Sequence, residues 1–102
     1  MEMNFITTIG LKENKEIRER TIAMYKDFYK AKSRILENAC DMFEDGYYKW
    51  AVISKIEEGI YPLSYLFDEN NTWFFFDENK NEIKELKERP EELIDYDLYI
   101  IG

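Results

Sequence analysis

The chain has 102 residues, of which 45% are hydrophobic and 35% charged, and its formal net charge is −8. This length predicts one domain, residues 1–102, and the hydrophobic content is sufficient for a packed core, which excludes a wholly disordered chain. No apolar run approaches the roughly 20 residues of a membrane-spanning helix, so we expect no membrane association. The single cysteine and the absence of a secretory signal pattern predict a cytoplasmic protein.

The first 43 residues change from strand-like to helix-like periodicity. Residues 4–10 predict a short strand, because Thr7 and Thr8 favour extended backbone. From residue 14 to residue 43, apolar side chains recur at steps of three and four, which predicts a long N-terminal helical region. A straight helix over 14–43 would span about 45 Å, whereas a typical strand covers about 20 Å. We therefore expect a break near residues 32–34, or an end that packs on another molecule.

The strongest strand signal is residues 47–56, which are rich in aromatic and β-branched side chains. In an extended chain Trp50 and Val52 share one face, and Ala51 and Ile53 share the other. Because both faces are apolar, this strand is expected inside a sheet that is covered on each side.

The second half predicts a meander of further strands. These are residues 60–67, with Pro62 at the start or on an edge, then 72–76, a short polar edge strand at 83–87, and a last strand at 95–101. The predicted fold class is α+β: a long, possibly broken, N-terminal helical region packed on a mostly antiparallel sheet of four or five strands. The expected order is strand, helix, then three strands, with one or two further short strands.

Catalytic chemistry is poorly supported by the composition. The chain has no histidine, which removes the commonest general base and the commonest metal ligand. Cys40 lies on the predicted apolar helix stripe and is expected to be a small buried hydrophobe. The alternation of Asp77, Asn79 and Asn81 resembles calcium-loop spacing, but Glu82 occupies the place where that loop needs glycine. We expect no metal, no cofactor and no catalytic residue, and carboxylate-based hydrolysis is the weakest of three functional interpretations.

Negative charge is concentrated in the second part of the chain. Residues 1–40 contain eight Lys or Arg and six Asp or Glu, whereas residues 41–102 contain six and sixteen. Acidic pairs occur at the predicted ends and turns of elements. The pairs taken as candidate partner-binding residues are Glu44, Asp45, Glu57, Glu58, Asp68, Glu69, Asp77 and Glu78.

A regular meander would divide these acids between the two ends of the sheet. Pairs 57–58 and 77–78 would lie at one end, and pairs 44–45, 68–69 and 91–92 at the other. Neighbouring strands are about 4.8 Å apart, so the carboxylates would be spaced somewhat like phosphates along a nucleic-acid strand. The alternative is ordinary, because turns commonly contain Asp, Glu and Asn.

Aromatic residues make up 17% of the chain and provide a second candidate surface. One helix covers one face of a sheet, so the opposite face is expected to expose some of Tyr47, Ile53, Tyr65 and Trp73. Tyr and Trp are favoured anchors in protein interfaces, so Tyr47, Tyr65 and Trp73 join the candidate partner-binding residues. Alternatively, a bent helix or a second copy of the chain buries both faces.

These features favour a small, acidic, non-enzymatic protein that binds and blocks a basic protein partner which acts on nucleic acid. Immunity proteins and phage inhibitors of the anti-CRISPR type have this general size and charge, which is an analogy and not a motif. Direct binding of nucleic acid is disfavoured, because phosphates would meet carboxylates. The alternative is a homo-oligomeric structural or accessory protein, for example a homodimer.

Overall fold

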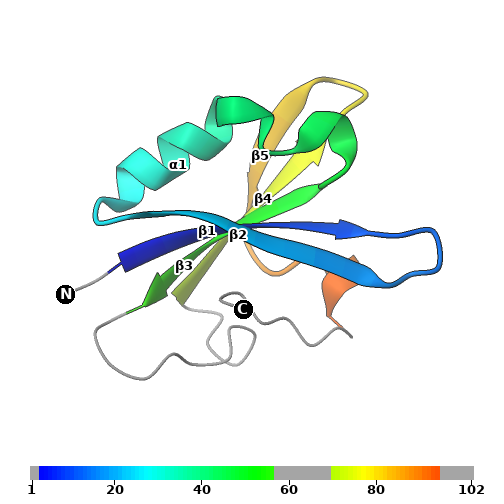
Figure 1. The fold of residues 1–102 in the computed structure, drawn as a ribbon, viewed down its shortest axis with the longest axis horizontal. Coiled ribbons are helices and arrows are strands. Elements are labelled where there is room, and N and C mark those ends of the chain that lie inside the picture. Colours follow the sequence, from blue (N-terminus) through cyan, green and yellow to red (C-terminus); the bar gives the residue numbers. More distant parts are fainter. Residues whose placement is uncertain (1–2, 57–69, 95–102) are drawn as a thin grey trace.

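The computed structural model describes residues 3–56 and 70–94, and within these ranges it has five strands and one α-helix (Figure 1). All strand pairs are antiparallel, and the strand order across the sheet is β2-β1-β3-β4-β5. The elements are β1 Met3–Leu11, β2 Ile17–Tyr25, α1 Phe28–Leu36, β3 Trp50–Ile56, β4 Asn71–Asp77 and β5 Glu82–Leu86. Short 3-10 turns lie at Ala39–Asp41, Glu44–Gly46 and Glu91–Leu93.

The predicted long N-terminal helical region, residues 14–43, is wrong. Ile17–Tyr25 forms β2, which pairs antiparallel with β1, and α1 has only nine residues. The register between these strands shifts, because Ile6 pairs with Ala23 but Thr7 pairs with Thr21. The intervening residue on β2 is the extra residue of a β-bulge, which interrupts the alternation of side chains along the strand.

The single helix is defined by its cap and its buried face. The side chain of Asp27 accepts a hydrogen bond from the backbone N–H of Tyr29 at 2.9 Å, which satisfies one of the unpaired donors of the first turn. Ala31 and Ile35 are fully buried beneath the helix. The helix is therefore short and amphipathic, with Ala31 and Ile35 on its buried face.

The other predicted strands lie close to where the sequence placed them. Strands predicted at 4–10, 72–76 and 83–87 are β1, β4 and β5, and β3 covers all but the first residues of 47–56. Lys49 continues the ladder before β3, because its N–H donates to Ile9 and its carbonyl accepts from Phe76. The predicted strands at 60–67 and 95–101 lie outside the described residues.

The helix-side face of the sheet carries the larger core. Phe43, from the segment after α1, stacks on Phe76 with ring centroids 5.2 Å apart. Ile6, Ile53 and Phe74 from the three central strands complete this core with Ala31, Ile35, Met42 and Ala51. Because Ile53 is only 1% exposed, it is not part of an uncovered sheet face.

The opposite face also buries large side chains. Ile9, Trp50, Val52 and Trp73 form a second core together with Leu93 from the 3-10 turn after β5. Trp73 is 2% exposed, so the expectation that this face displays it is not met. The sheet is thus covered on both sides, as the apolar character of residues 47–56 predicted.

The connection from α1 to β3 follows an unusual backbone path. Residues with positive φ are Asn38, Cys40, Asp41, Glu44, Asp45 and Gly46. Asn, Asp and Gly tolerate this conformation best, and they account for most of these positions. The Asn38 side chain accepts from the backbone N–H of Phe43 at 3.2 Å, which holds the turn around the buried ring. Cys40 is exposed on this segment, so the prediction of a buried cysteine is wrong.

Candidate functional site

Two of the predicted acidic pairs lie at one end of the sheet. Glu44 and Asp45 precede β3, and Asp77 and Glu78 follow β4. Because β3 pairs directly and antiparallel with β4, the start of one strand lies beside the end of the other. The expectation that these pairs occupy opposite ends is therefore wrong. It assumed a strand at residues 60–67 between them.

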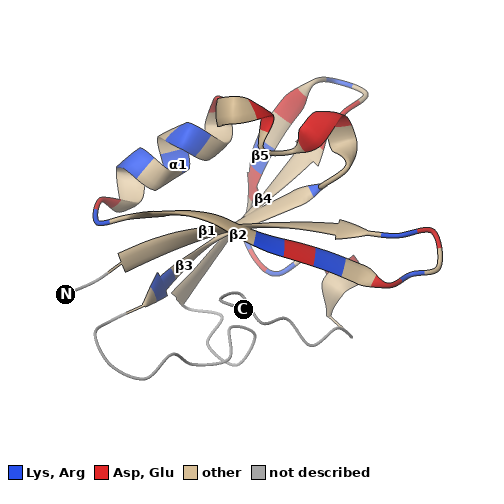
Figure 2. Cartoon of the chain, viewed as in Figure 1, with Lys and Arg blue, Asp and Glu red and all other residues tan. Residues whose placement is uncertain are grey.

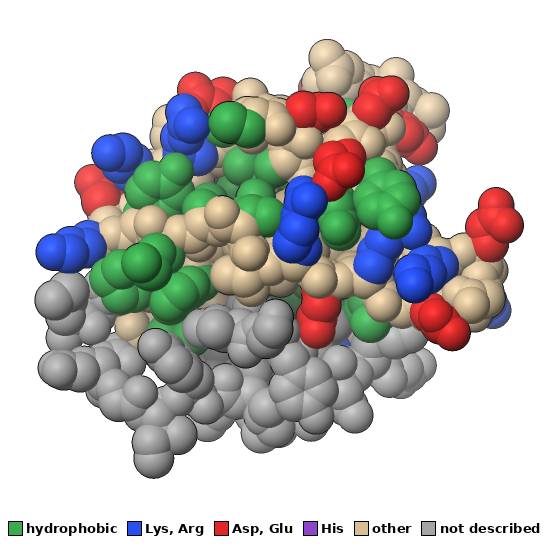
Figure 3. Space-filling view, in the orientation of Figure 1, with side chains coloured by type: hydrophobic (Ala, Val, Ile, Leu, Met, Phe, Trp, Pro, Cys, Tyr) green, Lys and Arg blue, Asp and Glu red, His purple; other side chains and the backbone are tan. Residues whose placement is uncertain are grey.

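Three of the four carboxylates at this end, those of Glu44, Asp77 and Glu78, already have partners within the chain. Glu44 forms an ion pair with Arg20 of β2 at 2.7 Å, and Glu78 lies 3.5 Å from the ammonium group of Lys49. Asp77 accepts hydrogen bonds from two backbone N–H groups of its own turn. Acidic and basic side chains are accordingly mixed along the strands and over the visible surface (Figures 2 and 3). This end is not a continuous acidic field.

Of the two predicted aromatic anchors that lie in the described residues, Tyr47 is accessible and Trp73 is buried. The Tyr47 side chain is half-exposed, and the guanidinium of Arg18 lies 3.6 Å from the ring centroid. Arg18 also donates to the Tyr47 carbonyl oxygen at 3.0 and 3.2 Å, so this tyrosine is bound to the edge strand. The remaining candidates, Glu57, Glu58, Asp68, Glu69 and Tyr65, lie outside the described residues.

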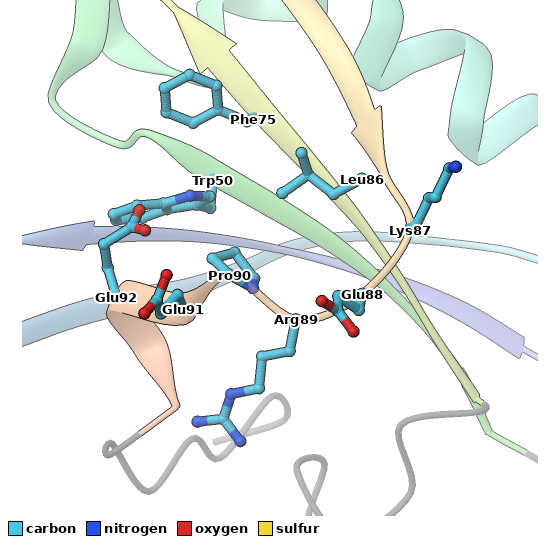
Figure 4. A pocket seen from close by; sticks show the side chains of 9 residues that line it. All are labelled: Trp50, Phe75, Leu86, Lys87, Glu88, Arg89, Pro90, Glu91 and Glu92. Carbon is cyan, nitrogen blue, oxygen red and sulfur yellow. The ribbon is translucent and has the colours of Figure 1, made fainter.

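A different surface combines accessible apolar side chains with acids that form no ion pair with any described cation. It is a hollow of 410 Å³ on the face opposite α1, which we call the Phe75 hollow (Figure 4). Phe75 and Leu86 are half-buried in its floor, above the buried Trp50, whose ring centroid lies 6.2 Å from that of Phe75. Its lining residues are Trp50, Phe75, Leu86, Lys87, Glu88, Arg89, Pro90, Glu91 and Glu92.

The rim of the Phe75 hollow is predominantly acidic. Glu88, Glu91 and Glu92 are exposed, and none forms an ion pair with a cation of the described ranges. Figure 4 shows Glu91 and Glu92 extending toward Trp50, whereas Lys87 and Arg89 extend away from the aromatic rings.

The backbone around Pro90 places these acids. Pro90 is buried and immediately precedes the 3-10 turn Glu91–Leu93, whose Leu93 is fully buried in the core of this face. Arg89 donates to the Leu93 carbonyl oxygen, which closes the turn. Anchored at Pro90 and Leu93, the turn holds Glu91 and Glu92 beside the apolar floor. The sequence signal was an acidic pair directly after an Arg-Pro break, but it gave no indication that Trp50 and Phe75 lie alongside.

Other kinds of site receive no support from the described residues. Within 3–56 and 70–94, no three Asp, Glu or Cys side chains converge in a way that could hold a metal ion. In the same ranges no helix has the length and apolar character needed to cross a membrane. No family model, curated protein or solved structure matches this chain.

Proposed function

We propose that the protein is a non-enzymatic, cytoplasmic binding protein that holds a basic segment of a protein partner in the Phe75 hollow. The observation that carries the proposal is the combination of a partly accessible apolar floor with three exposed carboxylates that no described cation neutralises. Lysine and arginine side chains are complementary to this surface, because each has an apolar stem that ends in a positively charged group. The stem would lie on Phe75 and Leu86, and the head would reach the acidic rim.

Charge pairing inside the chain explains why this surface is favoured over the acidic turns. A partner cation approaching Glu44 or Glu78 has to compete with Arg20 or Lys49, which are already in place. At the rim of the hollow the same cation meets carboxylates that form no ion pair with a described cation, so more of the electrostatic attraction is available for binding. The net charge of −8 additionally favours encounter with a basic protein.

The class of partner follows from this chemistry. Proteins that act on nucleic acid expose Lys and Arg along the groove that contacts phosphate. Occupation of such a groove by the acidic rim would exclude the nucleic acid, so the protein would act as a blocking inhibitor.

A charge-reversal comparison tests the proposal. The probe is a fluorescein-labelled peptide of alternating arginine and lysine, and its binding is measured by fluorescence anisotropy. We expect E91K/E92K to weaken binding by about tenfold or more, since charge pairs at an interface are commonly worth more than one decade in affinity. The matched control is E37K/E85K, which makes the same charge change on the helix side of the sheet, where both acids pair with cations.

The control separates local recognition from the effect of net charge. If both double variants lose affinity equally, the peptide responds only to overall charge and the Phe75 hollow is not the site. Circular dichroism of each variant verifies the fold. Light scattering of the unmodified protein shows whether a second copy occupies this face, and a dimer that hides Glu91 and Glu92 would also contradict the proposal.

A further inference from the structure

A second hollow lies on the opposite face of the sheet, beside the edge strand β2. It has a volume of 270 Å³ and lies between β2 and the segment that follows α1, and we call it the Arg20 cavity. Its lining residues are Ile6, Arg20, Ile22, Ala23, Tyr25, Arg34, Ala39, Cys40 and Met42. Ile6 is fully buried and Met42 nearly so, which gives the cavity an apolar floor.

The charge of this lining is opposite to that of the chain as a whole. Both charged groups in it, Arg20 and Arg34, are cations, and no described carboxylate is among its lining residues although the chain contains 22 acids. The two arginines come from different elements, β2 and α1. They therefore converge on the cavity through the fold and not through proximity in sequence.

Each guanidinium has one carboxylate neighbour outside the lining and further donors beyond it. One terminal nitrogen of Arg20 contacts Glu44 at 2.7 Å, and one of Arg34 contacts Glu37 at 3.1 Å. A guanidinium carries five N–H donors, so an anion in the cavity would share each arginine with its carboxylate neighbour and bind the donors that Glu44 and Glu37 leave open. The hydrogen bond and charge interaction with Tyr25, followed by the interaction with Glu37, raise the pKa of Arg34 above its ordinary value.

We propose that the Arg20 cavity binds a small organic anion, with its carboxylate or phosphate head between Arg20 and Arg34. Its short apolar body would lie on the partly exposed Ile22, Ala23 and Ala39, above the buried Ile6 and Met42. Planar guanidinium groups are suited to both head groups, because they present paired donors. The volume is slightly below the range of about 300–1,000 Å³ typical of ligand sites, which limits the body to a short chain or one small ring. This site is independent of the basic partner, since it lies on the other face and takes the opposite charge.

The binding experiment uses ligands that differ only in the head group. Hexanoate and hexyl phosphate are titrated into the protein, with hexylammonium and hexanol as controls, and backbone amide shifts are followed by NMR. We expect both anions to shift amides of β2 and of residues 39–42, and the two controls to leave them unchanged. The anion with the lower dissociation constant shows whether the cavity prefers a carboxylate or a phosphate head group. Equal shifts with hexylammonium, or no saturable shift with either anion, would overturn the proposal.

The single cysteine supplies a second measurement. Cys40 is exposed and lines the cavity, so its alkylation by uncharged iodoacetamide should slow when hexanoate occupies the site. Alkylation at an unchanged rate under saturating hexanoate would place the anion elsewhere.

Substitutions of the arginines test whether Arg20 and Arg34 bind the anionic head group. Arg34→Gln is expected to weaken hexanoate binding by about tenfold, as for the loss of one charge-assisted hydrogen bond. The matched control is Arg18→Gln, which also removes one positive charge. Arg18 lies on the face of β2 that carries Arg20, but it is not among the residues that line the cavity. An equal loss in both variants would show attraction by net charge only. If Arg20→Gln fails to fold because its ion pair with Glu44 is lost, Arg34→Gln decides the question alone.

Discussion

Of the two glycines in the described residues, Gly10 is the one where an added methyl group would meet backbone atoms at short distance. A Cβ at this residue would lie 2.5 Å from the carbonyl oxygen of Tyr47, 3.0 Å from Nε of Arg18 and 3.4 Å from Cα of Tyr48. Two of these three atoms belong to the backbone. That backbone is held in place, because the N–H of Tyr48 donates to Phe43 and the N–H of Lys49 donates to Ile9. In Gly10→Ala, therefore, the loop must move away from β1 as a unit.

The expected cost has two parts. Overpacking against structure that cannot yield costs typically about 1–3 kcal/mol. Movement of the loop also separates Arg18 from the ring and carbonyl of Tyr47, an exposed cation–π contact worth about 0.5–1 kcal/mol. The total of about 1.5–4 kcal/mol is a large fraction of the stability of an ordinary domain, about 5–15 kcal/mol.

Urea unfolding followed by tryptophan fluorescence measures this loss. With a denaturant slope of about 2 kcal/mol/M, the midpoint of Gly10→Ala should fall by roughly 1–2 M. The variant should retain the far-ultraviolet circular dichroism of a folded sheet in the absence of urea. An unchanged midpoint would mean that the loop relaxes freely, and the reasoning from close backbone approach would then be wrong.

Three further substitutions separate backbone strain, core packing and surface charge. Gly46→Ala should cost about 1 kcal/mol by urea unfolding, because Gly46 has a φ of +97° while the side chain that its Cβ would meet, Glu78, can move aside; a loss as large as that of Gly10→Ala would contradict this. Phe43→Ala should cost about 3–5 kcal/mol, since the ring is fully buried, and thermal denaturation followed by circular dichroism should show a much lower midpoint. Lys32→Met should change stability by less than about 1 kcal/mol, because its ion pair with Glu85 is partly exposed; a larger loss in the same melting experiment would indicate that this pair fixes α1 to β5.

The strands were predictable where alternation and composition agreed. Residues 47–56 combine aromatic and β-branched side chains on both faces, and β3 is indeed the central strand with neighbours on each side. The Lys and Glu content of residues 83–87 predicted an edge, and among the described strands β5 lies at one edge of the sheet.

Residues 17–25 were misread because a β-bulge imitates helical spacing. Thr21 and Ala23 point to opposite faces of the sheet, although an uninterrupted strand would place side chains two residues apart on the same face. The bulge at Ile22 therefore introduces a step of three on each face, from Arg20 to Ala23 and from Thr21 to Met24. The bulge depends on pairing with β1, which periodicity along one segment does not reveal. The β-branched residues Ile17, Thr21 and Ile22 were the local signal that favoured a strand.

The candidate site was only partly predictable for a related reason. An acidic residue can be read from the sequence, but whether its charge is available depends on which cation the fold places beside it. Glu44 forms an ion pair with Arg20. The periodicity of residues 14–43 placed Arg20 on a predicted helix, whereas it lies on strand β2. Glu91 and Glu92 were recognised as an acidic pair, yet their position beside Phe75 requires knowledge of how the chain returns after β5.

The bulge at Ile22 also bears on how the sheet ends. An open β-strand edge can template the addition of another chain, and aggregation often begins in this way. A straight strand laid along β2 could keep its hydrogen-bonding register on only one side of Ile22, because the bulge changes the direction and twist of the edge. The opposite border, β5, has only five residues and carries alternating charges. The two edges of the described sheet therefore disfavour the addition of another strand in different ways. At β2 the bulge changes the shape of the edge, and at β5 the strand is short and charged.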